Sequence, residues 1–528
     1  MPALATFPQQ LADAAGTHGD RIFIYTPSGE ISREISYADL DRLSTRVASG
    51  LLGRGLRPGD RIAIAAPNGI EWLALFFGAT RIGLLVVTLN VRYREHELEY
   101  MLNHSGAKAV VTVSALADFD YAAFYASFRE RIPGVEHIFF IEGVGGAAAA
   151  GPAFSELARA EPDTDAVLAA EAGVEADTPA VILYTSGTTG TPKGAVLTHG
   201  SVLASAAAQA GHLGTGDEDV YLGLLPLNHV GGLTCTVSAA LVSRAAVVLM
   251  PSFSPETAIA AAERHRVTVF GGVPTMYTLI LGRPEFASAD LGSVRIALVG
   301  GSNADPALCA SIAQRFPDAR LTNLYGLSEC SGGCVFSAAE DDLATVSRTL
   351  GVPIGDFQAR VVDGGGTEVG PGGEGELHLR GGGVAAGYWG TAGEGAETFL
   401  PGGWLATGDM VALEPDGHLV LRGRKKEMFL QGGYNVYPVE VENVLTAHPA
   451  VAMAAGIGVP DPVLGEIGRY YVVPKPGVDA PGEAELIEFC RARLADYKAP
   501  RQIRFAEELP LTPAGKIAKA ALRASADT

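Results

Sequence analysis

The chain has 528 residues, of which 48% are apolar and 19% are charged, and its formal net charge is -20 at pH 7 with a pI near 5.0. A chain of this length is too long for one hydrophobic core, so we expect about three or four domain-sized units in a globular protein. The acidic balance argues against a general nucleic-acid or anionic-membrane surface, and solubility is the simplest role of the charge.

The cysteine content and the N-terminus both favour a cytoplasmic protein. Five cysteines are few and odd in number, and Cys330 and Cys334 lack a second pair that would complete a metal site. The segment Met1–Gln10 has no basic start followed by an apolar core, so nothing marks export. The most apolar stretch, Trp72–Leu89, is interrupted by Arg81 and is typical of a buried helix followed by a strand, so we expect no membrane span.

The first part of the chain alternates helix-like and strand-like segments, which is typical of an α/β lobe with a mainly parallel sheet. The stretch from Gly143 to Asp177 is rich in Ala, Gly, Glu and Pro, and we expect it to cross the surface and to separate two lobes. The expected helices are Tyr37–Gly53, Glu71–Ala79 and Glu95–Ser105, and the expected strands are Ile62–Ala65, Leu84–Thr88 and Ala109–Val113.

A second α/β lobe is expected next, followed by a small β-rich subdomain after Gly351 and a return to mixed α and β structure after Arg424. The predicted fold class is α/β, with a large N-terminal domain over residues 1–424 and a small mobile α+β C-terminal domain over residues 425–528. The strands expected in the second lobe are Val220–Leu225, Ala246–Met250, Val267–Gly271, Arg295–Val299 and Leu321–Leu324. Those expected in the β-rich subdomain are Ala359–Val362, Gly375–Arg380 and His418–Arg422. In the C-terminal domain the expected helices are Val439–Ala447 and Glu483–Ala495, and the expected strands are Val451–Val459 and Arg469–Val473.

The run Tyr184-Thr-Ser-Gly-Thr-Thr-Gly-Thr-Pro-Lys193-Gly194 concentrates glycines, hydroxyl side chains and one lysine just after the apolar segment Val181–Leu183. Glycine lets backbone N–H groups close around phosphate oxygens, hydroxyls add neutral donors, and lysine adds a cation. The run is not a Walker A loop, because Pro192 stands directly before Lys193 where that motif needs glycine. We therefore expect a nucleotide-phosphate loop of another kind, since a simple turn would need only two or three such residues.

Three further segments place useful side chains at the ends of expected strands. Asn323–Glu329 supplies an aromatic ring, a hydroxyl and a carboxylate; a flat ring can stack on a base, and a carboxylate suits a hard divalent cation. Gly300-Gly301-Ser302 has paired glycines that let the backbone approach a flat ligand. Trp404–Asp409 ends in a carboxylate, which is a natural acceptor for a diol.

Two more segments lie toward the C-terminus. The basic run Leu421–Glu427 precedes Gly432–Pro438, and a basic surface loop alone would not account for the glycine pair that follows it. Leu509–Ile517 contains Lys516 after a proline and a glycine. Such a lysine is usually solvated, but a cation aimed between an attacking carboxylate and a phosphate would offset the negative charge that grows in a transition state.

These segments, in this order, resemble the AMP-forming adenylating superfamily, which includes acyl-CoA synthetases, luciferases and nonribosomal peptide adenylation domains. The resemblance runs from about Tyr37 to Leu522. Two departures are small: Ser328 stands where many members have Thr, and Glu427 stands where Asp or Ser is common.

The resemblance implies roles for individual residues, with ATP, Mg²⁺ and coenzyme A as ligands. The catalytic residues are then Lys516, Thr185, Glu329 and His229, with Glu329 as the magnesium ligand. Lys426 is the hinge, and Gly432 and Gly433 face the pantetheine of CoA. The nucleotide-binding residues are Thr185, Ser186, Gly187, Thr188, Thr189, Gly190, Lys193, Gly300, Gly301, Ser302, Asn323, Tyr325, Gly326, Ser328, Asp409, Arg424 and Lys516. The substrate pocket is His229, Val230, Gly231, Gly272, Val273, Gly301 and Gly332.

The implied activity is that of an ATP-dependent acyl-CoA ligase working in two half-reactions. A carboxylate attacks the α-phosphate of ATP to give acyl-AMP and pyrophosphate, and a thiolate then displaces AMP after the C-terminal domain swings about its hinge. An aspartate that would pair with an amino group is missing from Phe270–Thr275, so an α-amino acid is not expected. Glycines in the pocket segments would deepen an apolar tunnel, which favours a medium- or long-chain fatty acid, with an aryl acid as the alternative.

Other classes stay open at this stage. A carrier protein could replace free CoA as acceptor, and a homodimer is not excluded; a nucleic-acid partner is not expected. A nonenzymatic nucleotide-binding protein is the least favoured, because Lys193, Glu329, Asp409 and Lys516 are all present.

Overall fold

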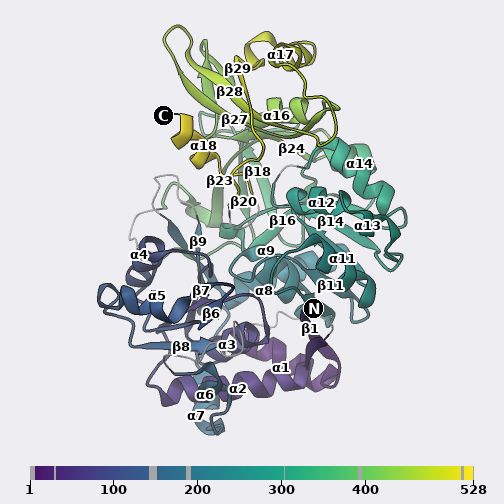
Figure 1. Cartoon of the computed structure of the whole chain (residues 1–528). Helices are drawn as coiled ribbons and strands as arrows, with labels where there is room; N and C mark the ends of the chain where they lie inside the picture. The colour runs from purple at the N-terminus through teal and green to yellow at the C-terminus, as the bar shows by residue number, and fades with distance from the viewer. Residues whose placement is uncertain are drawn as a thin grey trace.

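The structure, a computed structural model of the chain, describes residues 6–28, 31–141, 152–185, 192–302, 304–390, 395–512 and 516–526. It is a mixed α/β protein with a large N-terminal domain and a small C-terminal domain, as predicted. Figure 1 shows the small domain above the large one, with helix α18 (Lys519–Ala526) beside strand β27 (Val451–Asp461). Among the described residues, no helix combines the length and the apolar character that a membrane crossing requires.

The first lobe is built on a seven-stranded sheet. Its strands lie in the order β21 (Gly387–Tyr388), β10 (Lys193–Thr198), β9 (Pro179–Thr185), β4 (Leu85–Thr88), β3 (Arg61–Ala65), β5 (Ala109–Val113) and β8 (His137–Ile141). The strands from β9 to β8 pair in parallel, whereas β10 turns back antiparallel against β9. Parallel strands are covered on both faces, and the burial of β5 at every position agrees with this.

The second lobe is built on a nine-stranded sheet. Its strands lie in the order β17 (Val352–Pro353), β16 (Gly332–Phe336), β15 (Arg320–Leu327), β14 (Ile296–Gly300), β13 (Val269–Gly272), β11 (Val220–Gly223), β12 (Ala246–Leu249), β1 (Ile22–Ser28) and β2 (Ile31–Ser36). The strands from β15 to β1 pair in parallel. The hairpin of β1 and β2 was not expected from the sequence, and it joins the beginning of the chain to the second lobe through β12.

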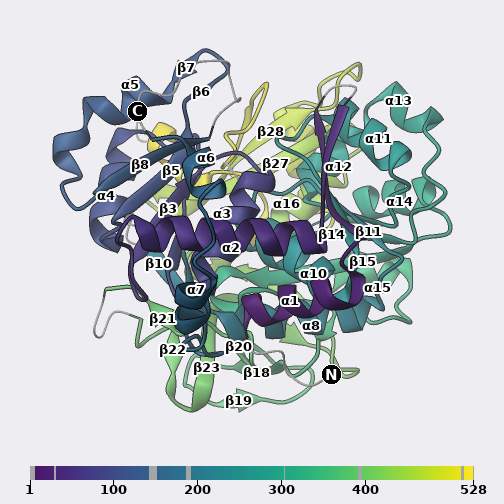
Figure 2. The same cartoon turned by 90° about the horizontal axis from the view of Figure 1, so that it is seen from below.

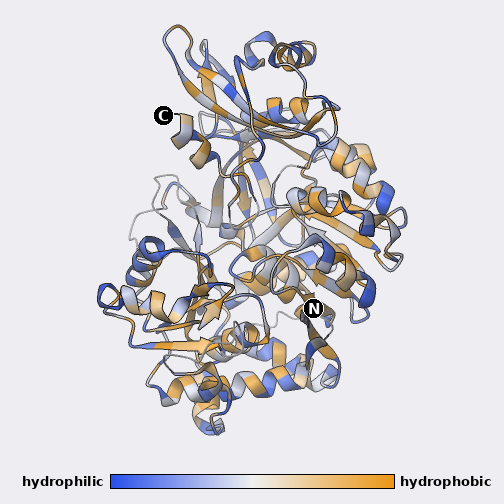
Figure 3. Cartoon of the chain, in the orientation of Figure 1, coloured by the Kyte–Doolittle hydropathy of each residue, from blue (hydrophilic) through white to orange (hydrophobic). Residues whose placement is uncertain are grey.

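Helices cover both sheets, and Figure 3 shows apolar residues concentrated in the strands and on the inner faces of the helices. The helices around the first lobe are α2 (Tyr37–Gly53), α3 (Ile70–Arg81), α4 (Glu95–Ser105), α5 (Tyr121–Ser127) and α8 (His199–Leu213). Those around the second are α10 (Ala239–Ser243), α11 (Pro255–Arg264), α12 (Pro274–Leu281), α13 (Pro284–Ser288), α14 (Pro306–Arg315) and α15 (Leu343–Arg348).

The contact between helices α2 and α3 shows how the local sequence determines the packing. The side chain of Ser36 caps α2 by accepting a hydrogen bond from the N–H of Asp39 at 3.1 Å. Helices α2 and α3 approach closely because Gly78 has no side chain: a Cβ there would lie 2.8 Å from the carbonyl oxygen of Ser44. Figure 2 shows α2 running across the underside of the molecule beside α1 (Phe7–His18).

The stretch from Gly143 to Asp177, expected as a surface crossing, contains two helices in its described part. These are α6 (Phe154–Ala158) and α7 (Thr164–Glu171), and both pack against α2. The contact is close, because a Cβ on Gly50 would lie 2.9 Å from the Cα of Leu157. The buried residues of the two helices are Phe154, Leu157 and Val167, too few to give the strong apolar pattern that would have predicted them.

The β-rich subdomain and the C-terminal domain each have their own sheet. In the subdomain the strands are β19 (Glu368–Val369), β18 (Gln358–Val362), β20 (Glu374–Arg380), β23 (Trp404–Leu413) and β22 (Phe399–Leu400), and β24 (Leu419–Arg424) pairs with β23. In the C-terminal domain they are β26 (Tyr434–Val436), β25 (Phe429–Gln431), β28 (Gly465–Pro474), β27 and β29 (Gln502–Phe505), with helices α16 (Pro438–Thr446) and α17 (Glu483–Arg491). Separate apolar clusters around Tyr470 and Ile457 form the core of this domain.

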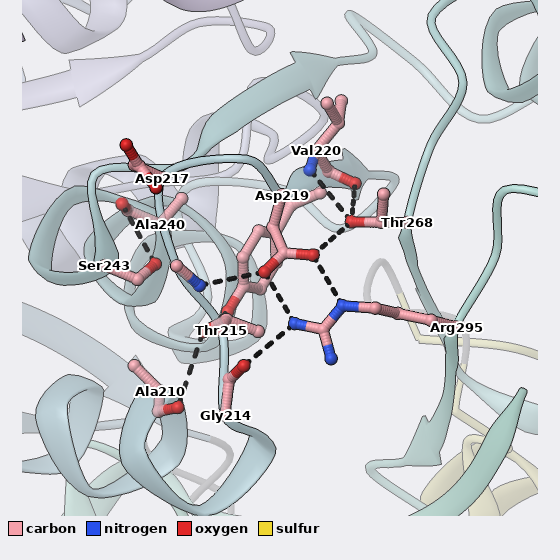
Figure 4. Close-up of polar contacts among 12 residues, drawn as sticks. Ala210, Gly214, Thr215, Asp217, Asp219, Val220, Ala240, Ser243, Thr268 and Arg295 are labelled. Atoms are coloured by element: carbon pink, nitrogen blue, oxygen red, sulfur yellow. Dashed lines mark hydrogen bonds and ion pairs between the residues drawn. The ribbon is translucent and has the colours of Figure 1, made fainter.

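A buried carboxylate ties together the beginnings of three neighbouring strands of the second lobe (Figure 4). Asp219 accepts hydrogen bonds from Thr268 Oγ1 at 2.6 Å and from the N–H of Gly216 at 2.8 Å. Arg295 donates to both of its oxygens, at 2.8 and 2.6 Å. Burial alone would raise the pKa of Asp219, but these donors together hold that pKa below its ordinary value.

Candidate active site

A carboxylate shared by a phenol and a guanidinium forms the centre of the site. Asp409 on β23 and Arg424 on β24 are directly paired in the antiparallel ladder, so their side chains share one face of the sheet. Arg424 Nε lies 3.0 Å from Asp409 Oδ1, and Tyr325 on β15 donates its O–H to Asp409 Oδ2 at 2.6 Å. The buried Asp409 carboxylate raises the pKa of Arg424. Each carboxylate oxygen keeps a free lone pair, so the group can still accept from a ligand diol.

Lys516 connects the C-terminal domain to this cluster. Its Cε lies 3.7 Å from the place that a Cβ on Gly301 would occupy, so its aliphatic stem passes close to that glycine. Burial lowers the pKa of the Lys516 amine and the Arg424 guanidinium lowers it further, while the carboxylates of Asp409 and Glu329 act in the opposite direction. The structure thus brings a cation from the end of the chain into the region of Gly301, Asp409 and Arg424.

Glu329 and Lys193 both contact one aromatic residue. Tyr388 on β21 donates its O–H to Glu329 Oε1 at 2.8 Å, and the Lys193 amine lies 5.2 Å from the centre of the Tyr388 ring. The sequence reasoning missed Tyr388, because its position depends on the pairing of β21 with β10, where Ala195 is its partner. A short aromatic pair after glycines carries no signal strong enough to identify it.

The phosphate loop is described only at its two ends. Thr185 ends β9 and Lys193 begins β10, and these two residues are paired in register. Thr185 Oγ1 donates to the Lys193 carbonyl at 3.4 Å. The predicted nucleotide-binding residues Ser186, Gly187, Thr188, Thr189 and Gly190 lie outside the described residues. The described ends nevertheless place the lysine at the last strand pair before the segment that connects β9 and β10.

The predicted adenine-side segments lie at the carboxyl ends of β14 and on β15. The backbone of β15 approaches Gly300 closely, since a Cβ on Gly300 would lie 2.3 Å from the carbonyl oxygen of Leu324. Gly301 adopts a φ of 80°, which favours glycine. Gly326 is equally constrained, because a Cβ would meet the carbonyl oxygen of Gly332 at 2.2 Å. The remaining predicted residues of this group differ in exposure: Ser302 is exposed, Ser328 is buried, and the Asn323 side chain donates to the carbonyl of Thr349 at 2.8 Å.

His229 is a half-buried, neutral imidazole. Its Nδ1 accepts a hydrogen bond from the N–H of Gly231 at 3.0 Å, at the start of the short helix α9 (Val230–Gly232). Burial lowers the pKa of His229 to about 3, and Lys516 contributes in the same direction. The ring is therefore uncharged at neutral pH, and the effect of Lys516 indicates that the two side chains lie near one another.

The glycines of the predicted acyl pocket have different roles. A Cβ on Gly231 would meet Leu225 at 2.7 Å, and a Cβ on Gly332 would meet Cys235 and Thr234 at 3.2 Å. These two glycines therefore allow close packing rather than opening a tunnel. Around Gly272 and Gly271 the nearest atoms lie at 3.5 and 3.9 Å, and Val273 stands within 3.3 Å of a Cβ placed on Gly301. A Cβ at Gly271 or Gly272 would thus make only ordinary van der Waals contacts, so the packing is looser on the β13 side.

Lys426, the predicted hinge, precedes the first C-terminal hairpin, and the glycine pair lies at the turn of that hairpin. Burial lowers the pKa of Lys426, and the neighbouring charges include Lys193 and Glu329. Gly432 and Gly433 form the turn between β25 and β26, with φ values of 61° and 84° that favour glycine. No hydrogen bond or ion pair within the described part of the chain joins these glycines to the cluster around Lys516.

Comparison with known proteins identifies the class of molecule to which this fold and site belong. The model of the family described as "AMP-binding enzyme" matches residues 11–389, and that described as "AMP-binding enzyme C-terminal domain" matches residues 440–516. The chain therefore belongs to the AMP-binding enzyme family.

Individual relatives narrow the class to the acyl-CoA ligases. The chain is 36% identical to the 3-[(3aS,4S,7aS)-7a-methyl-1,5-dioxo-octahydro-1H-inden-4-yl]propanoyl:CoA ligase of Mycobacterium tuberculosis (strain ATCC 25618 / H37Rv), over 90% of this chain and 91% of that protein. It is 32% identical to the long-chain fatty acid CoA ligase FadD13 of the same strain, over 94% of each. The crystal structure of the anthranilate CoA ligase AuaEII in complex with anthranoyl-AMP superposes with a TM-score of 0.88 at 27% identity, covering 100% of this chain and 98% of that one. The protein is an acid–thiol ligase of the AMP-forming acyl-CoA synthetase type, a class that uses ATP and CoA.

Proposed function

We propose that this ligase activates a hydrophobic carboxylic acid as acyl-AMP at the cluster of Asp409, Arg424 and Lys516, and then transfers the acyl group to free CoA. The observation that carries the proposal is the position of Lys516 beside Gly301, which supports the arrangement needed for the first half-reaction. A cation there is near the predicted nucleotide site and offsets the charge that grows as the acid attacks.

Each half-reaction exchanges one bond. A carboxylate oxygen of the acid bonds to the α-phosphorus of ATP, the bond from that phosphorus to the bridging oxygen breaks, and pyrophosphate leaves with the electron pair. In the second step the CoA thiolate attacks the acyl carbon and AMP leaves. Asp409 accepts from the ribose, Tyr325 and Arg424 hold that carboxylate in place, and Lys516 stays protonated near the transferred phosphate.

Glu329 is the residue that would hold Mg²⁺. One of its oxygens accepts from Tyr388, so the other remains available, and one carboxylate is a common protein contribution to a magnesium ion that is otherwise bound by phosphates and water. When bound, the ion would neutralise charge on the phosphates. Lys193, whose amine lies 5.2 Å from the centre of the Tyr388 ring, adds a cation to the same phosphate side.

The domain boundary near residue 424, the hinge at Lys426 and the CoA-facing role of Gly432 and Gly433 belong to the same proposal. They are supported by the separate core of the C-terminal domain and by the turn that the two glycines form. All five cysteines are free, which supports the predicted reducing, cytoplasmic setting. A homodimer and a carrier-protein acceptor stay predictions.

The acid itself has two candidates. A medium- or long-chain fatty acid needs a deep apolar tunnel, and the looser packing near Gly271 supports one on that side. An aryl or other ring-bearing acid is favoured by the filled places beside Gly231 and Gly332, which shorten the pocket on the other side. The relatives are named for both kinds of acid.

A substrate panel tests the proposal. ATP–pyrophosphate exchange is measured with saturated acids from C4 to C16, with benzoates and with ring-bearing propanoates, and CoA thioester formation is followed for each acid that responds. We expect exchange with hydrophobic acids and thioester formation with CoA alone. A response to aromatic acids only would reject the fatty-acid candidate, and exchange without thioester formation would point to a carrier-bound acceptor.

A further inference from the structure

A buried ion cluster holds the beginning of the last helix. Lys519, the first residue of α18, places its Nζ 2.7 Å from Glu427 Oε2 and 2.8 Å from Glu442 Oε1. The lysine and Glu442 side chains are each only 14% exposed, and Glu442 also accepts a hydrogen bond from the N–H of Gly456 at 2.7 Å. One amine thus joins the segment after Lys426, helix α16 and the C-terminal helix.

The charges in this cluster depend on one another. Burial alone would lower the pKa of Lys519, but Glu442 and Glu427 outweigh it and raise that pKa above its usual value. Burial also raises the pKa of Glu442, whereas Lys519 holds the pKa of Glu427 below its usual value despite burial. Because both carboxylates pair with the same cation, removing it would leave the largely buried Glu442 and the half-buried Glu427 without that ion pair.

Lys519 lies three residues after Lys516, at the base of the same hairpin. The N–H of Thr512 donates to the Lys516 carbonyl at 2.6 Å, and the N–H of Ala518 donates to the Pro510 carbonyl at 2.7 Å. Leu511 and Ile517 form the bridge between these two bonds. Lys519 follows the paired end of this hairpin directly, so a shift of Lys519 would be passed to the hairpin through one peptide bond.

Glu427 connects this anchor to the ribose side of the site. The N–H groups of Glu427 and Met428 donate to the Arg424 carbonyl at 3.0 and 3.1 Å, which makes residues 424–428 a tight turn. Arg424 at its start is the residue paired with Asp409. A continuous line of contacts therefore runs from Asp409 through Arg424 and Glu427 to Lys519 and the Lys516 hairpin.

We propose that Lys519, Glu427 and Glu442 position Lys516 for the adenylation step. The inference rests on the proposed role of Lys516. Lys519 is a positioning residue, because it acts through the hairpin and is itself held by the two glutamates. The length of Glu427 matters for this role, although Asp or Ser is common at this position in the family. An aspartate would withdraw the carboxylate from Lys519 by about 1.5 Å, the length of one carbon–carbon bond.

The test compares the two half-reactions in full-length variants. For K519M we expect the kcat of ATP–pyrophosphate exchange to fall by about 10- to 100-fold, because a displacement of about 1 Å can cost that much. Thioester formation from preformed acyl-AMP should stay unchanged, since that step does not use Lys516. K519R should restore most of the exchange, and E427D should give an intermediate loss. R491M is the control, because it likewise replaces a cation with methionine, but in the exposed pair with Glu488 on α17.

The outcomes separate the inference from the function beneath it. Wild-type exchange by K519M, or an equal loss of both half-reactions in K519M and E427D, would overturn the positioning role; an equal loss would indicate a general structural effect. If K519M does not fold, E427D keeps all three ionisable groups and is judged by the same split. Failure of the unaltered enzyme to adenylate any acid would overturn the proposed function itself.

Discussion

The Lys516 amine illustrates how a single residue's environment can set an enzyme's pH range. The residue is placed among a guanidinium and two carboxylates, and burial together with Arg424 lowers its pKa from the ordinary 10.5. A buried cation with a lowered pKa loses its proton at a lower pH than a solvated lysine. Adenylation should therefore be more sensitive to alkaline pH than a surface lysine would make it.

We predict that the adenylation rate stays level at neutral pH and falls as pH rises through the lowered pKa of Lys516, below 10.5. K516R, whose guanidinium stays charged, should keep weak adenylation and lose this alkaline limb. K516A should lose adenylation by about 10²-fold or more and keep thioester formation from preformed acyl-AMP. Single-turnover acyl-AMP formation across pH is the measurement. If K516R shows the same alkaline limb, that limb belongs to a group other than Lys516.

Residue-level reasoning from the sequence reached the groups whose motifs are local. Tyr325, Asp409, Arg424 and Lys516 each belong to a short segment with its own chemistry, and the structure brings them together. Tyr388 was not predicted, because its position depends on a strand pairing that no local pattern encodes.

At the scale of elements, the Asp219 cluster holds β11, β13 and β14 at their amino ends, away from the site at the carboxyl ends. Its carboxylate has a lowered pKa, so the stability it contributes is present above the unfolded value near 3.8 and is lost as pH falls through the folded pKa. If the charge of Asp219 were removed, Thr268, Gly216 and Arg295 would donate to a neutral group, which is a weaker acceptor.

We therefore predict that D219N lowers the thermal midpoint at pH 7 by several degrees, because hydrogen bonds to a charged group contribute about 1.5–3 kcal/mol. The difference from the unaltered protein should begin to shrink as pH falls below about 3.8, where the unfolded carboxylate takes up a proton, and should shrink further as pH falls through the lower pKa of the folded protein. Thermal unfolding between pH 3 and 7 measures this. D217N, on the exposed carboxylate two residues earlier, should change little. An equal midpoint for D219N at every pH would contradict the prediction.

Elements with a strong local pattern were predicted to the residue. Helix α2 begins and ends where expected, at Tyr37 and Gly53, because Ser36 caps it and its apolar face is periodic. Strand β1 was not predicted, because its partner β12 lies more than 200 residues away and its own apolar run is short. The two helices between Gly143 and Asp177 were missed because small residues give little hydrophobic periodicity.

At the scale of the whole molecule, the proposed function assigns the arrangement around Lys516 to the first half-reaction, since this lysine lies beside Gly301 while Gly432 and Gly433 lie in the turn between β25 and β26. On the same proposal, the second half-reaction requires the C-terminal domain to rotate. Rotation about few residues needs large changes in their backbone dihedrals, and Lys426 lies directly after the Arg424–Lys425 segment bound to Asp409 and Glu376.

We predict that K426P separates the two half-reactions in the opposite sense to K516A. Proline fixes φ near −65° and restricts the residue before it, so the hinge loses the freedom that rotation needs. ATP–pyrophosphate exchange should persist, and thioester formation from preformed acyl-AMP should fall by at least about 10-fold, if rotation and not chemistry limits that step. K426A removes the charge without restricting the backbone and should retain both activities. If K426P forms thioester at the rate of K426A, rotation at this residue is not required, and the hinge must lie elsewhere between β24 and β25.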